Sequence, residues 1–539
     1  MRAPGWSSVD RTLHALAIVA TLVSVSRPFW AAKYPPITDL PFHASETSVF
    51  RHYGDPSFHF REQFELQPFA VPYLSSYLLG AALMLVLPTV PAVKLATSIM
   101  LLALPAGLAT LAWGMRKSPL LGLAGLPLVW SNLTQWGFIN FVAALGFFAA
   151  ALGLTLRVLD RPSRRTTGAL AVVLVLVLVT HVFRYPFALL ATLGTTALAY
   201  PLRRRVRPVL IAVAPSLLLF AVFWRLRPAE LAGHTELAVE TARVAELPGF
   251  LIGSFTGDGE RQLMRDHTWV LGVVALGSLA TRLFEERARL RRLGRAALAA
   301  RAPRRARLAR SIVARAAFGA IATGATAMCA LGFLAGFLTL PMQIGDWWYI
   351  YPREALATVF IALGLLPDLP RGAWARALAV VALSFSGLRT SAYVAEQYAS
   401  FDAVTRDFDA ISREIPPAPK LLYLMFDRSG SSRGPTALMH LPAYVQAEKG
   451  GWLSFHFAVW GTSPIRYRSG PGAVVPPPVP RRWEWTPQAF DVREHGPFFD
   501  WFLIRSETDP SRLLRADRSI HLVDHQGTWW LYQRRLAGP

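Results

Sequence analysis

The feature that most constrains this fold is a series of apolar runs close to the length needed to cross a lipid bilayer. A membrane-spanning helix needs about 20 mostly apolar residues. With 53% hydrophobic residues and a mean hydropathy of +0.33, the 539-residue chain is too apolar for a soluble protein. We therefore predict a mainly α, polytopic transmembrane helix bundle of about eleven spans. The runs fall at 13–26, 90–114, 119–136, 138–158, 168–183, 186–201, 209–224, 268–284, 312–340, 355–366 and 374–393.

The formal net charge of +22 is concentrated in the gaps between the runs, which is the positive-inside pattern of membrane proteins. The first run lacks a small-residue cleavage site before Lys33, so it reads as an uncleaved anchor with a cytoplasmic N-terminus. Residues 71–87 are assigned to an interfacial helix, because a further span there would place Arg116 and Lys117 outside. The gaps then assigned to the inside hold more than twice as many basic residues as the short outside ones. The outer loop 33–70 is expected on the exoplasmic side.

Segment 282–315 carries twelve arginines in a background of leucine and alanine, interrupted at Pro303. Such a segment attracts anionic lipid headgroups by about 1 kcal/mol per basic residue. It has almost no aromatic side chains that could stack on bases, which argues against nucleic acid. We expect a cytoplasmic amphipathic hairpin bound to anionic lipids. Cys329 is the single cysteine, which excludes an intramolecular disulfide.

Beyond residue 393 the composition becomes that of a soluble domain, so the chain divides into 1–393 and 394–539. Apolar residues at helical spacing predict a helix over 401–415, ended by Pro416 and Pro417. The pattern predicts a small exoplasmic α/β domain. Its strand candidates are 420–426, 452–460, 499–505, 519–524 and 529–534.

A Gly/Ser-rich loop, 427–434, follows the first of these strands and precedes a helix candidate that begins at Pro435. A loop of this kind can bind phosphate at a helix N-terminus. It matches neither a P-loop nor a dinucleotide fingerprint, so a plain surface loop is favoured. His440, in the following helix, is expected to be a packed, hydrogen-bonded histidine.

The polar stretch 37–46 follows the first run and is the strongest candidate for function. Pro41 fits the first turn of a helix, so Thr38 or Asp39 reads as its N-cap. Steps of four and three residues place Asp39, His43 and Glu46 on one helical face. Capping and catalysis both use an aspartate here, so both interpretations of Asp39 stay open.

Other polar side chains occur where the outer ends of later runs are expected, and ionisable groups at membrane depth are functional candidates by default. An interfacial aromatic belt would also explain Trp348. Snorkelling, or pairing with a neighbouring acid, would also explain Arg184 and Arg353. The substrate-binding candidates are Arg184, Arg353, Asn140, His181 and Trp348.

No zinc-type spacing, nucleophile elbow or Walker sequence is present, so the sequence indicates neither a cofactor nor a metal. An exoplasmic carboxylate, several arginines that could hold a phosphate and a membrane-embedded groove together suit a lipid-phosphate substrate.

The layout of the chain resembles the GT-C superfamily of polyprenyl-phosphate-sugar glycosyltransferases. It has one span, a long outer loop with an acid near its start, a Pro-Tyr-type segment at 68–73, a bundle and an outer soluble domain. The resemblance covers roughly residues 11–200, and 137–141 and 181–184 also resemble uncharacterised bacterial membrane proteins of this layout. Members typically have paired acids in the first loop and often an aspartate in the second, whereas this chain has Asp39 alone and Asn140.

The resemblance implies an inverting glycosyltransferase in the bacterial inner membrane, with Asp39 as the catalytic base. His43 and Glu46 would orient the base or the acceptor, and Arg353 and Arg184 would hold the departing lipid phosphate. The expected partner is a polyprenyl-phosphate-linked sugar. The competing class is a non-enzymatic membrane protein, either a lipid or solute transporter or an envelope assembly factor.

Overall fold

A computed structural model describes residues 8–71, 73–227, 237–299, 302–480 and 482–535. Pro72 of the Pro-Tyr-type segment lies outside this part, as do the arginine side chains at 289–310. The anionic-lipid hairpin therefore stays a prediction at the level of its side chains.

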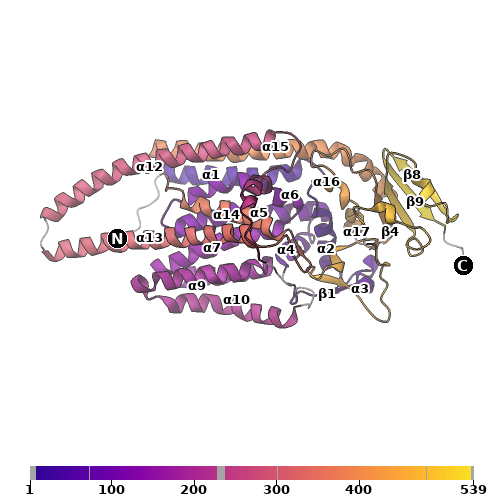
Figure 1. Cartoon of the computed structure of the whole chain (residues 1–539), viewed down its shortest axis with the longest axis horizontal. Helices are drawn as coiled ribbons and strands as arrows, with labels where there is room; N and C mark the ends of the chain where they lie inside the picture. Colours follow the sequence, from indigo (N-terminus) through magenta and orange to yellow (C-terminus); the bar gives the residue numbers. More distant parts are fainter. Residues whose placement is uncertain (1–7, 72, 228–236, 300–301, 481, 536–539) are drawn as a thin grey trace.

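The described part of the chain is built around long apolar helices that run side by side (Figure 1). Seven of them are long and apolar enough to cross a membrane, which confirms the transmembrane helix bundle. Helices α8 (Arg164–Thr180), α9 (Arg184–Arg203) and α14 (Ile350–Ala362) are shorter or less apolar members of the bundle. The seven are α1 (Ser8–Ser26), α5 (Thr89–Gly114), α7 (Ile139–Asp160), α10 (Val206–Leu226), α12 (Gly259–Ala299), α13 (Ala302–Thr339) and α15 (Ala373–Glu414).

Helices α5 and α7 pack backbone to backbone through two glycine contacts spaced seven residues apart. A Cβ on Gly107 would lie 2.0 Å from the Gly146 carbonyl oxygen, and one on Gly114 would lie 2.1 Å from that of Gly153. Small residues allow such an approach in membranes, where close packing drives the association of helices. α7 is consequently buried along nearly its whole length and forms the centre of the bundle.

The run 119–136 does not form the span that its hydropathy suggests. Its residues form two 3-10 helices, η3 (Pro119–Gly125) and η4 (Pro127–Trp130), and the short helix α6 (Asn132–Trp136). Pro119 and Pro127 each begin a new turn because proline lacks the N–H that would continue the preceding helix. The segment is buried between helices, so its apolar residues serve packing within the protein.

The elements of the first outer loop gather at one end of the bundle (Figure 1). Helix α4 has only nine residues, too few to cross a bilayer. The interfacial location expected for 71–87 stays a prediction. These elements are α2 (Leu40–His52), α3 (Phe60–Gln63), β1 (Phe64–Leu66) and α4 (Ser75–Leu83).

The C-terminal region is a small α/β unit around a five-stranded sheet of order β5-β4-β7-β9-β8. The first three strands in this order are parallel, and β9 is antiparallel to both of its neighbours. Two short helices, α16 (Thr436–Met439) and α17 (Ala443–Lys449), follow β4. The strands are β4 (Lys420–Met425), β5 (Trp452–Leu453), β7 (Trp501–Arg505), β8 (Ile520–Gln526) and β9 (Trp529–Arg534). The strand expected over 452–460 ends at Leu453, because a 3-10 turn at Phe457–Val459 follows.

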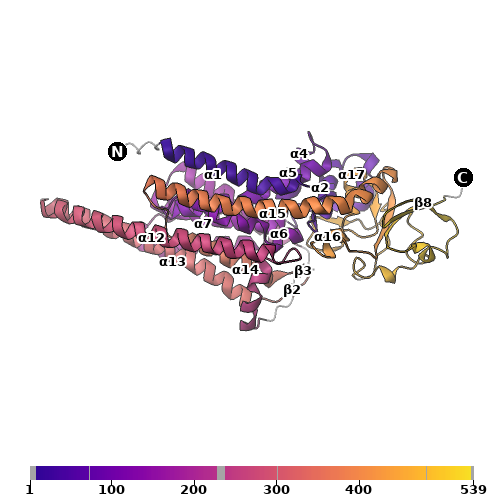
Figure 2. The ribbon, with the colours of Figure 1, turned by 90° about the horizontal axis from the view of Figure 1, so that it is seen from above.

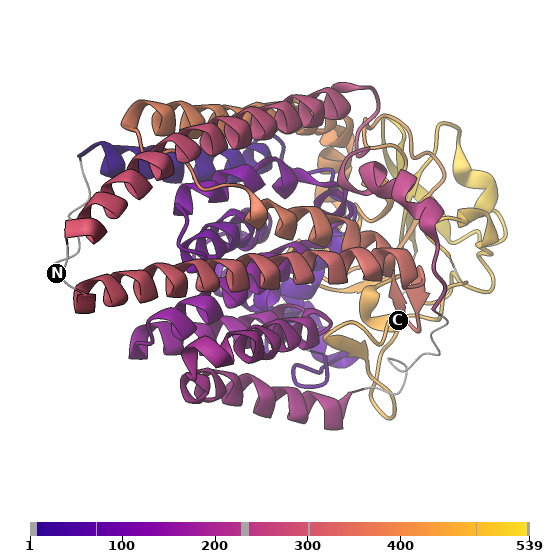
Figure 3. The same ribbon diagram turned by 60° about the vertical axis from the view of Figure 1, so that its left-hand side comes forward.

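Several contacts join this unit to the rest of the chain, and two of them involve secondary-structure elements of both parts. Helix α15 continues without a break from the bundle to Glu414 beside the sheet (Figure 2). Strand β1 of the first outer loop pairs with β6 (Ile465–Tyr467). Figure 3 shows the α12–α13 hairpin projecting from the opposite end of the bundle. The outer-loop elements and the sheet therefore share one end, and the basic hairpin occupies the other.

Candidate active site

Asp39 lies immediately before helix α2, but its carboxylate makes no capping hydrogen bond to that helix. Instead, its backbone is fixed against the end of α6, where the amide of Asp39 donates to the carbonyl of Trp136 at 3.1 Å. The next residue, Gly137, has φ of +104°, and a Cβ there would lie 2.6 Å from the Cβ of Asp39. Only glycine fits both the conformation and the space. The carboxylate is thus positioned from outside α2, and its side chain remains 19% exposed.

His440 contacts this carboxylate. Its Nδ1 lies 3.2 Å from Oδ1 of Asp39 and 3.2 Å from the carbonyl oxygen of Thr38. The imidazole is buried against the rings of Phe42 and Phe457. The expectation of a packed histidine describes this burial, but it did not include the contact with Asp39.

Arg433 approaches the same turn from the loop 427–434. Its Nη2 donates to the Gln135 carbonyl at 3.0 Å and to Thr38 Oγ1 at 3.3 Å, and its Nη1 donates to the Ser254 carbonyl at 2.8 Å. Burial lowers the pKa of Arg433 to about 10, against the opposing influence of Tyr398 and nearby acids, so the guanidinium stays charged at neutral pH. In the loop 427–434, which was expected to be a plain surface loop, Ser429 and Gly430 are exposed, but the side chain of Arg433 is buried in the candidate site.

His43 and Glu46 form a polar layer behind Asp39. His43 Nε2 lies 2.9 Å from the carbonyl oxygen of Gly137, and its Nδ1 lies 2.9 Å from the Tyr77 hydroxyl. Glu46 is buried, 3.8 Å from His43, and accepts a hydrogen bond from Ser463 at 2.6 Å. Burial opposes both charges, but the interaction between the two groups outweighs it, raising the pKa of His43 and lowering that of Glu46. Neither side chain contacts Asp39 directly, so they support its surroundings.

A second cluster forms around Arg353 at the start of α14. Arg353 Nη1 and the Tyr73 hydroxyl each lie 3.2 Å from Nε2 of His181. The guanidinium carbon lies 4.3 Å from the centre of the Phe138 ring, and Nη2 donates to the Trp348 carbonyl at 2.9 Å. Within the described part of the chain, Arg353 has no carboxylate within ion-pair distance. It is therefore a cation available to an anionic ligand.

Arg184 is in a different state, because it is buried in a bidentate ion pair with Glu354 and both side chains are only 3% exposed. Its guanidinium also lies 4.7 Å from the Phe141 ring. Asn140 is buried on the same helix as Phe141, and its Oδ1 has no hydrogen-bond partner among the described residues. The pairing that the sequence left open for arginine thus applies to Arg184, and Arg353 remains the cation without an acidic partner among the described residues.

An aromatic segment connects the two clusters. Trp136 and Phe138 flank Gly137, and they contact Trp348 at ring-centre distances of 5.5 and 6.5 Å. Burial raises the pKa of Tyr349 to about 12, while Arg433 and Arg353 both act in the opposite direction, so this phenol lies within the field of both cations. Trp348 itself is 42% exposed, as either a belt residue or a ligand contact would be.

The structure thus brings the predicted residues together in two neighbouring clusters, one around Asp39 and one around Arg353, at the end of the bundle that carries the sheet. Sequence reasoning assigned no role to Arg433, Tyr73 or Tyr77, although Arg433 lies in the Gly/Ser-rich loop 427–434 and Tyr73 in the Pro-Tyr-type segment 68–73. Among the described residues, no group of three His, Cys, Asp or Glu side chains is arranged to hold a metal ion.

No known family model matches this sequence. No curated protein matches it either. Two solved structures of ArnT from Cupriavidus metallidurans align over 98% of this chain. The one bound to undecaprenyl phosphate has 16% sequence identity, 99% coverage of its own chain and a TM-score of 0.47. The apo structure has 14% identity, 98% coverage and a TM-score of 0.48.

Proposed function

We propose that this chain is a membrane glycosyltransferase that moves a sugar from a polyprenyl-phosphate donor to an acceptor hydroxyl. The observation that carries the proposal is the state of Asp39. Its carboxylate is partly exposed, is not used as a helix cap, and is held in place by Gly137 and His440. Beyond the aromatic segment lies Arg353, a cation with no acidic partner within ion-pair distance among the described residues.

The proposed reaction is a direct displacement. Asp39 takes the proton from the acceptor hydroxyl as that oxygen forms a bond to the anomeric carbon of the sugar. The bond from the anomeric carbon to the phosphate oxygen breaks, and the lipid phosphate leaves with the electron pair. Arg353 stabilises this developing negative charge through charge-assisted hydrogen bonds. His440 holds the carboxylate in orientation, and Arg433 fixes the turn that carries it.

The remaining candidates take supporting roles. Arg184 is neutralised by Glu354, so we assign it to holding the start of α14, and with it Arg353. His181 orients the Arg353 guanidinium. Asn140 and Trp348 are assigned to the sugar and the lipid, because one has an unpartnered buried carbonyl oxygen and the other an exposed indole.

We place the reaction at the periplasmic face of a bacterial inner membrane, with a cytoplasmic N-terminus. The basic hairpin and the candidate site occupy opposite ends of the bundle, as this orientation requires (Figure 3). The unit at 394–539 would then be periplasmic, and the arginine-rich hairpin would contact anionic lipids of the inner leaflet.

Asp39→Asn tests the role of the proposed base. Asparagine keeps the volume of the side chain but cannot accept the proton, so transfer should fall by about 10²- to 10⁴-fold. The measurement is sugar release from a panel of polyprenyl-phosphate sugars by protein purified in detergent. The control is Asp258→Asn, which changes an aspartate that is 80% exposed and should leave transfer unchanged.

Wild type and Asp39→Asn must have matching melting temperatures for the comparison to count. Equal transfer by both proteins would remove Asp39 from the mechanism. If wild type itself transferred no sugar from the full donor panel, the transporter or assembly-factor class would take the place of the enzyme.

A further inference from the structure

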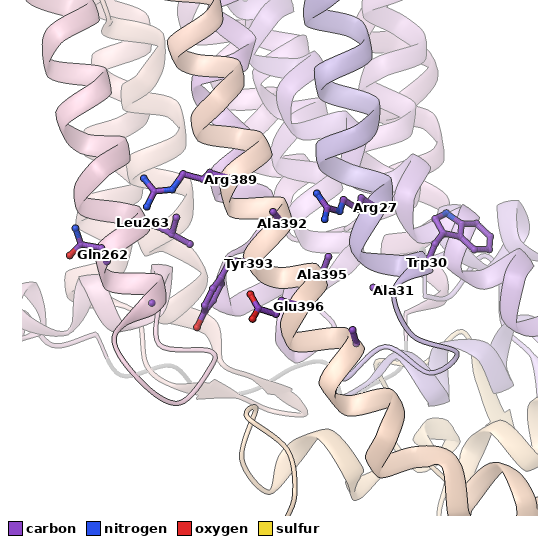
Figure 4. A pocket seen from close by; sticks show the side chains of 12 residues that line it. Arg27, Trp30, Ala31, Gln262, Leu263, Arg389, Ala392, Tyr393, Ala395 and Glu396 are labelled. Atoms are coloured by element: carbon purple, nitrogen blue, oxygen red, sulfur yellow. The ribbon is translucent and has the colours of Figure 1, made fainter.

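A groove of about 910 Å³ lies on the side of the bundle, apart from the candidate active site. It is bordered by the end of α1 with the 3-10 helix η1 (Arg27–Trp30), the start of α12 and the middle of α15 (Figure 4). Trp30 at its edge is 53% exposed, and an indole in that position is typical of the membrane–water interface. The groove therefore opens at the depth of lipid headgroups.

The floor of the groove is apolar. Of the charged side chains that line it, one has an ion-pair partner and two do not. Arg389 of α15 is tied to Asp266 of α12 at 2.7 Å. Within the described part of the chain, Arg27 and Glu396 form no ion pair, although both are exposed in the groove. The groove thus offers one unpaired cation and one unpaired anion above a hydrophobic surface formed by Leu263, Ala392, Ala395 and Ala399.

A wall of aromatic side chains separates this groove from the candidate active site. The ring of Tyr393, which lines the groove, packs against Phe255, and Phe255 packs against Tyr398. The hydroxyl of Tyr398 donates to Gln135, the residue whose carbonyl accepts from Arg433. The groove backs onto the site without sharing its residues, so what binds there does not depend on the proposed sugar transfer.

We propose that this groove binds a zwitterionic glycerophospholipid whose headgroup ends in a primary ammonium. The phosphodiester would accept hydrogen bonds from Arg27 and from the remaining N–H groups of Arg389. The ammonium would donate to Glu396, and the acyl chains would cover the apolar floor. The terminal glycerol of phosphatidylglycerol can donate a hydrogen bond to Glu396 but brings no positive charge to balance it, and a quaternary ammonium has no N–H to donate. The charge pattern therefore selects phosphatidylethanolamine over both phosphatidylglycerol and phosphatidylcholine.

Lipid binding to the full chain can be measured by native mass spectrometry in detergent. The probes are phosphatidylethanolamine, phosphatidylglycerol and phosphatidylcholine with identical acyl chains. Glu396→Gln should weaken phosphatidylethanolamine by about fivefold, the range of one exposed ion pair, without weakening phosphatidylglycerol. Arg27→Gln should weaken all three lipids. Exposed residues away from the groove provide the matched controls, Glu414→Gln and Arg225→Gln, and neither should change the headgroup preference.

Glu396→Lys is a second variant with the opposite expectation, because two unpaired cations in the groove, beside the paired Arg389, should favour phosphatidylglycerol. The proposal is overturned if Glu396→Gln weakens the three lipids equally, or if it acts no differently from Glu414→Gln. It is also overturned if wild type shows no phosphatidylethanolamine binding that Arg27→Gln reduces.

Discussion

At the scale of single residues, the candidate site depends on the carboxylate of Asp39, which does not cap helix α2 although it lies immediately before it. An aspartate before a helix normally accepts from the first backbone amides, and that bond would occupy the oxygen needed to take a proton. Here the Gly137 contact and His440 position the carboxylate instead. The same turn is held by backbone hydrogen bonds to α6, so orientation comes from the surroundings and the carboxylate oxygens remain available.

The His43–Glu46 pair predicts a pH dependence of stability. The pKa of Glu46 is lowered by folding, so its contribution is present above its unfolded pKa and is lost as pH falls through the folded value. The pKa of His43 is raised, so its contribution is present below its unfolded pKa and is lost as pH rises through the folded value. The melting temperature in detergent should therefore be highest between these limits and decline on both sides.

Glu46→Gln should remove the decline of the melting temperature on the acidic side of this pH profile. It should also lower the free energy of unfolding near pH 6 by about 3 kcal/mol, because the charge of half-buried His43 loses its buried partner. Glu65→Gln is the matched control: Glu65 pairs with Arg466 near the surface, and its loss should cost at most about 1 kcal/mol. An unchanged decline on the acidic side in Glu46→Gln would contradict the assignment.

Sequence reasoning found Asp39, His43 and Glu46 because their spacing is local. It could not find the contacts of Asp39 with His440 or of Thr38 with Arg433, because those partners lie in the other half of the chain. A basic residue within a Gly/Ser loop was a signal in hindsight, but the burial of Arg433 depends on its contacts with Thr38, Gln135 and Ser254, which are distant in the sequence.

At the scale of elements, the glycine contacts between α5 and α7 predict a strongly position-dependent effect of one methyl group. Gly146→Ala places a Cβ 2.1 Å from the carbonyl oxygen of Ala103, so the two helices must separate. The expected loss is about 2 kcal/mol in the free energy of unfolding, as for other overpacked cores. Thermal unfolding in detergent measures it.

Gly168→Ala makes the same chemical change in α8, where nothing lies within 4 Å of the new Cβ. Alanine has the higher helix propensity, so this variant should be neutral or more stable by up to about 1 kcal/mol. Equal destabilisation by both changes would show that close packing of α5 on α7 is not the cause.

Elements with a uniform pattern were predictable, and those that depend on tertiary packing were not. The strand 529–534 was expected with the bounds that β9 has, because its aromatic and aliphatic residues are bordered by turn residues. Run 119–136 has the hydropathy of a span, but its prolines and glycines permit separate short turns, and neighbouring helices bury them. Hydropathy measures how apolar a segment is. It cannot show whether that segment is surrounded by lipid or by other parts of the protein.

At the scale of the whole molecule, the two ends of the bundle differ in charge and content, and this predicts the topology. Alkaline phosphatase fused to the C-terminus of the full chain should be active, because it would lie in the periplasm with the sheet. A fusion within 287–310 should be inactive, because the hairpin is at the other end (Figure 2). The reverse result would place Asp39 on the cytoplasmic side and end the lipid-donor proposal.

Helix α15 gives the molecule a mechanical property. Its 42 residues form one rod of roughly 63 Å, which begins beside an ion pair between Arg376 and Asp10 and ends at the sheet. An unbroken helix has no hinge, so a ligand that displaces the sheet must tilt the rod inside the bilayer. That tilt is resisted where Gly387 is packed tightly against Leu126. A displacement of the sheet is consequently transmitted along α15 to the helices of the bundle.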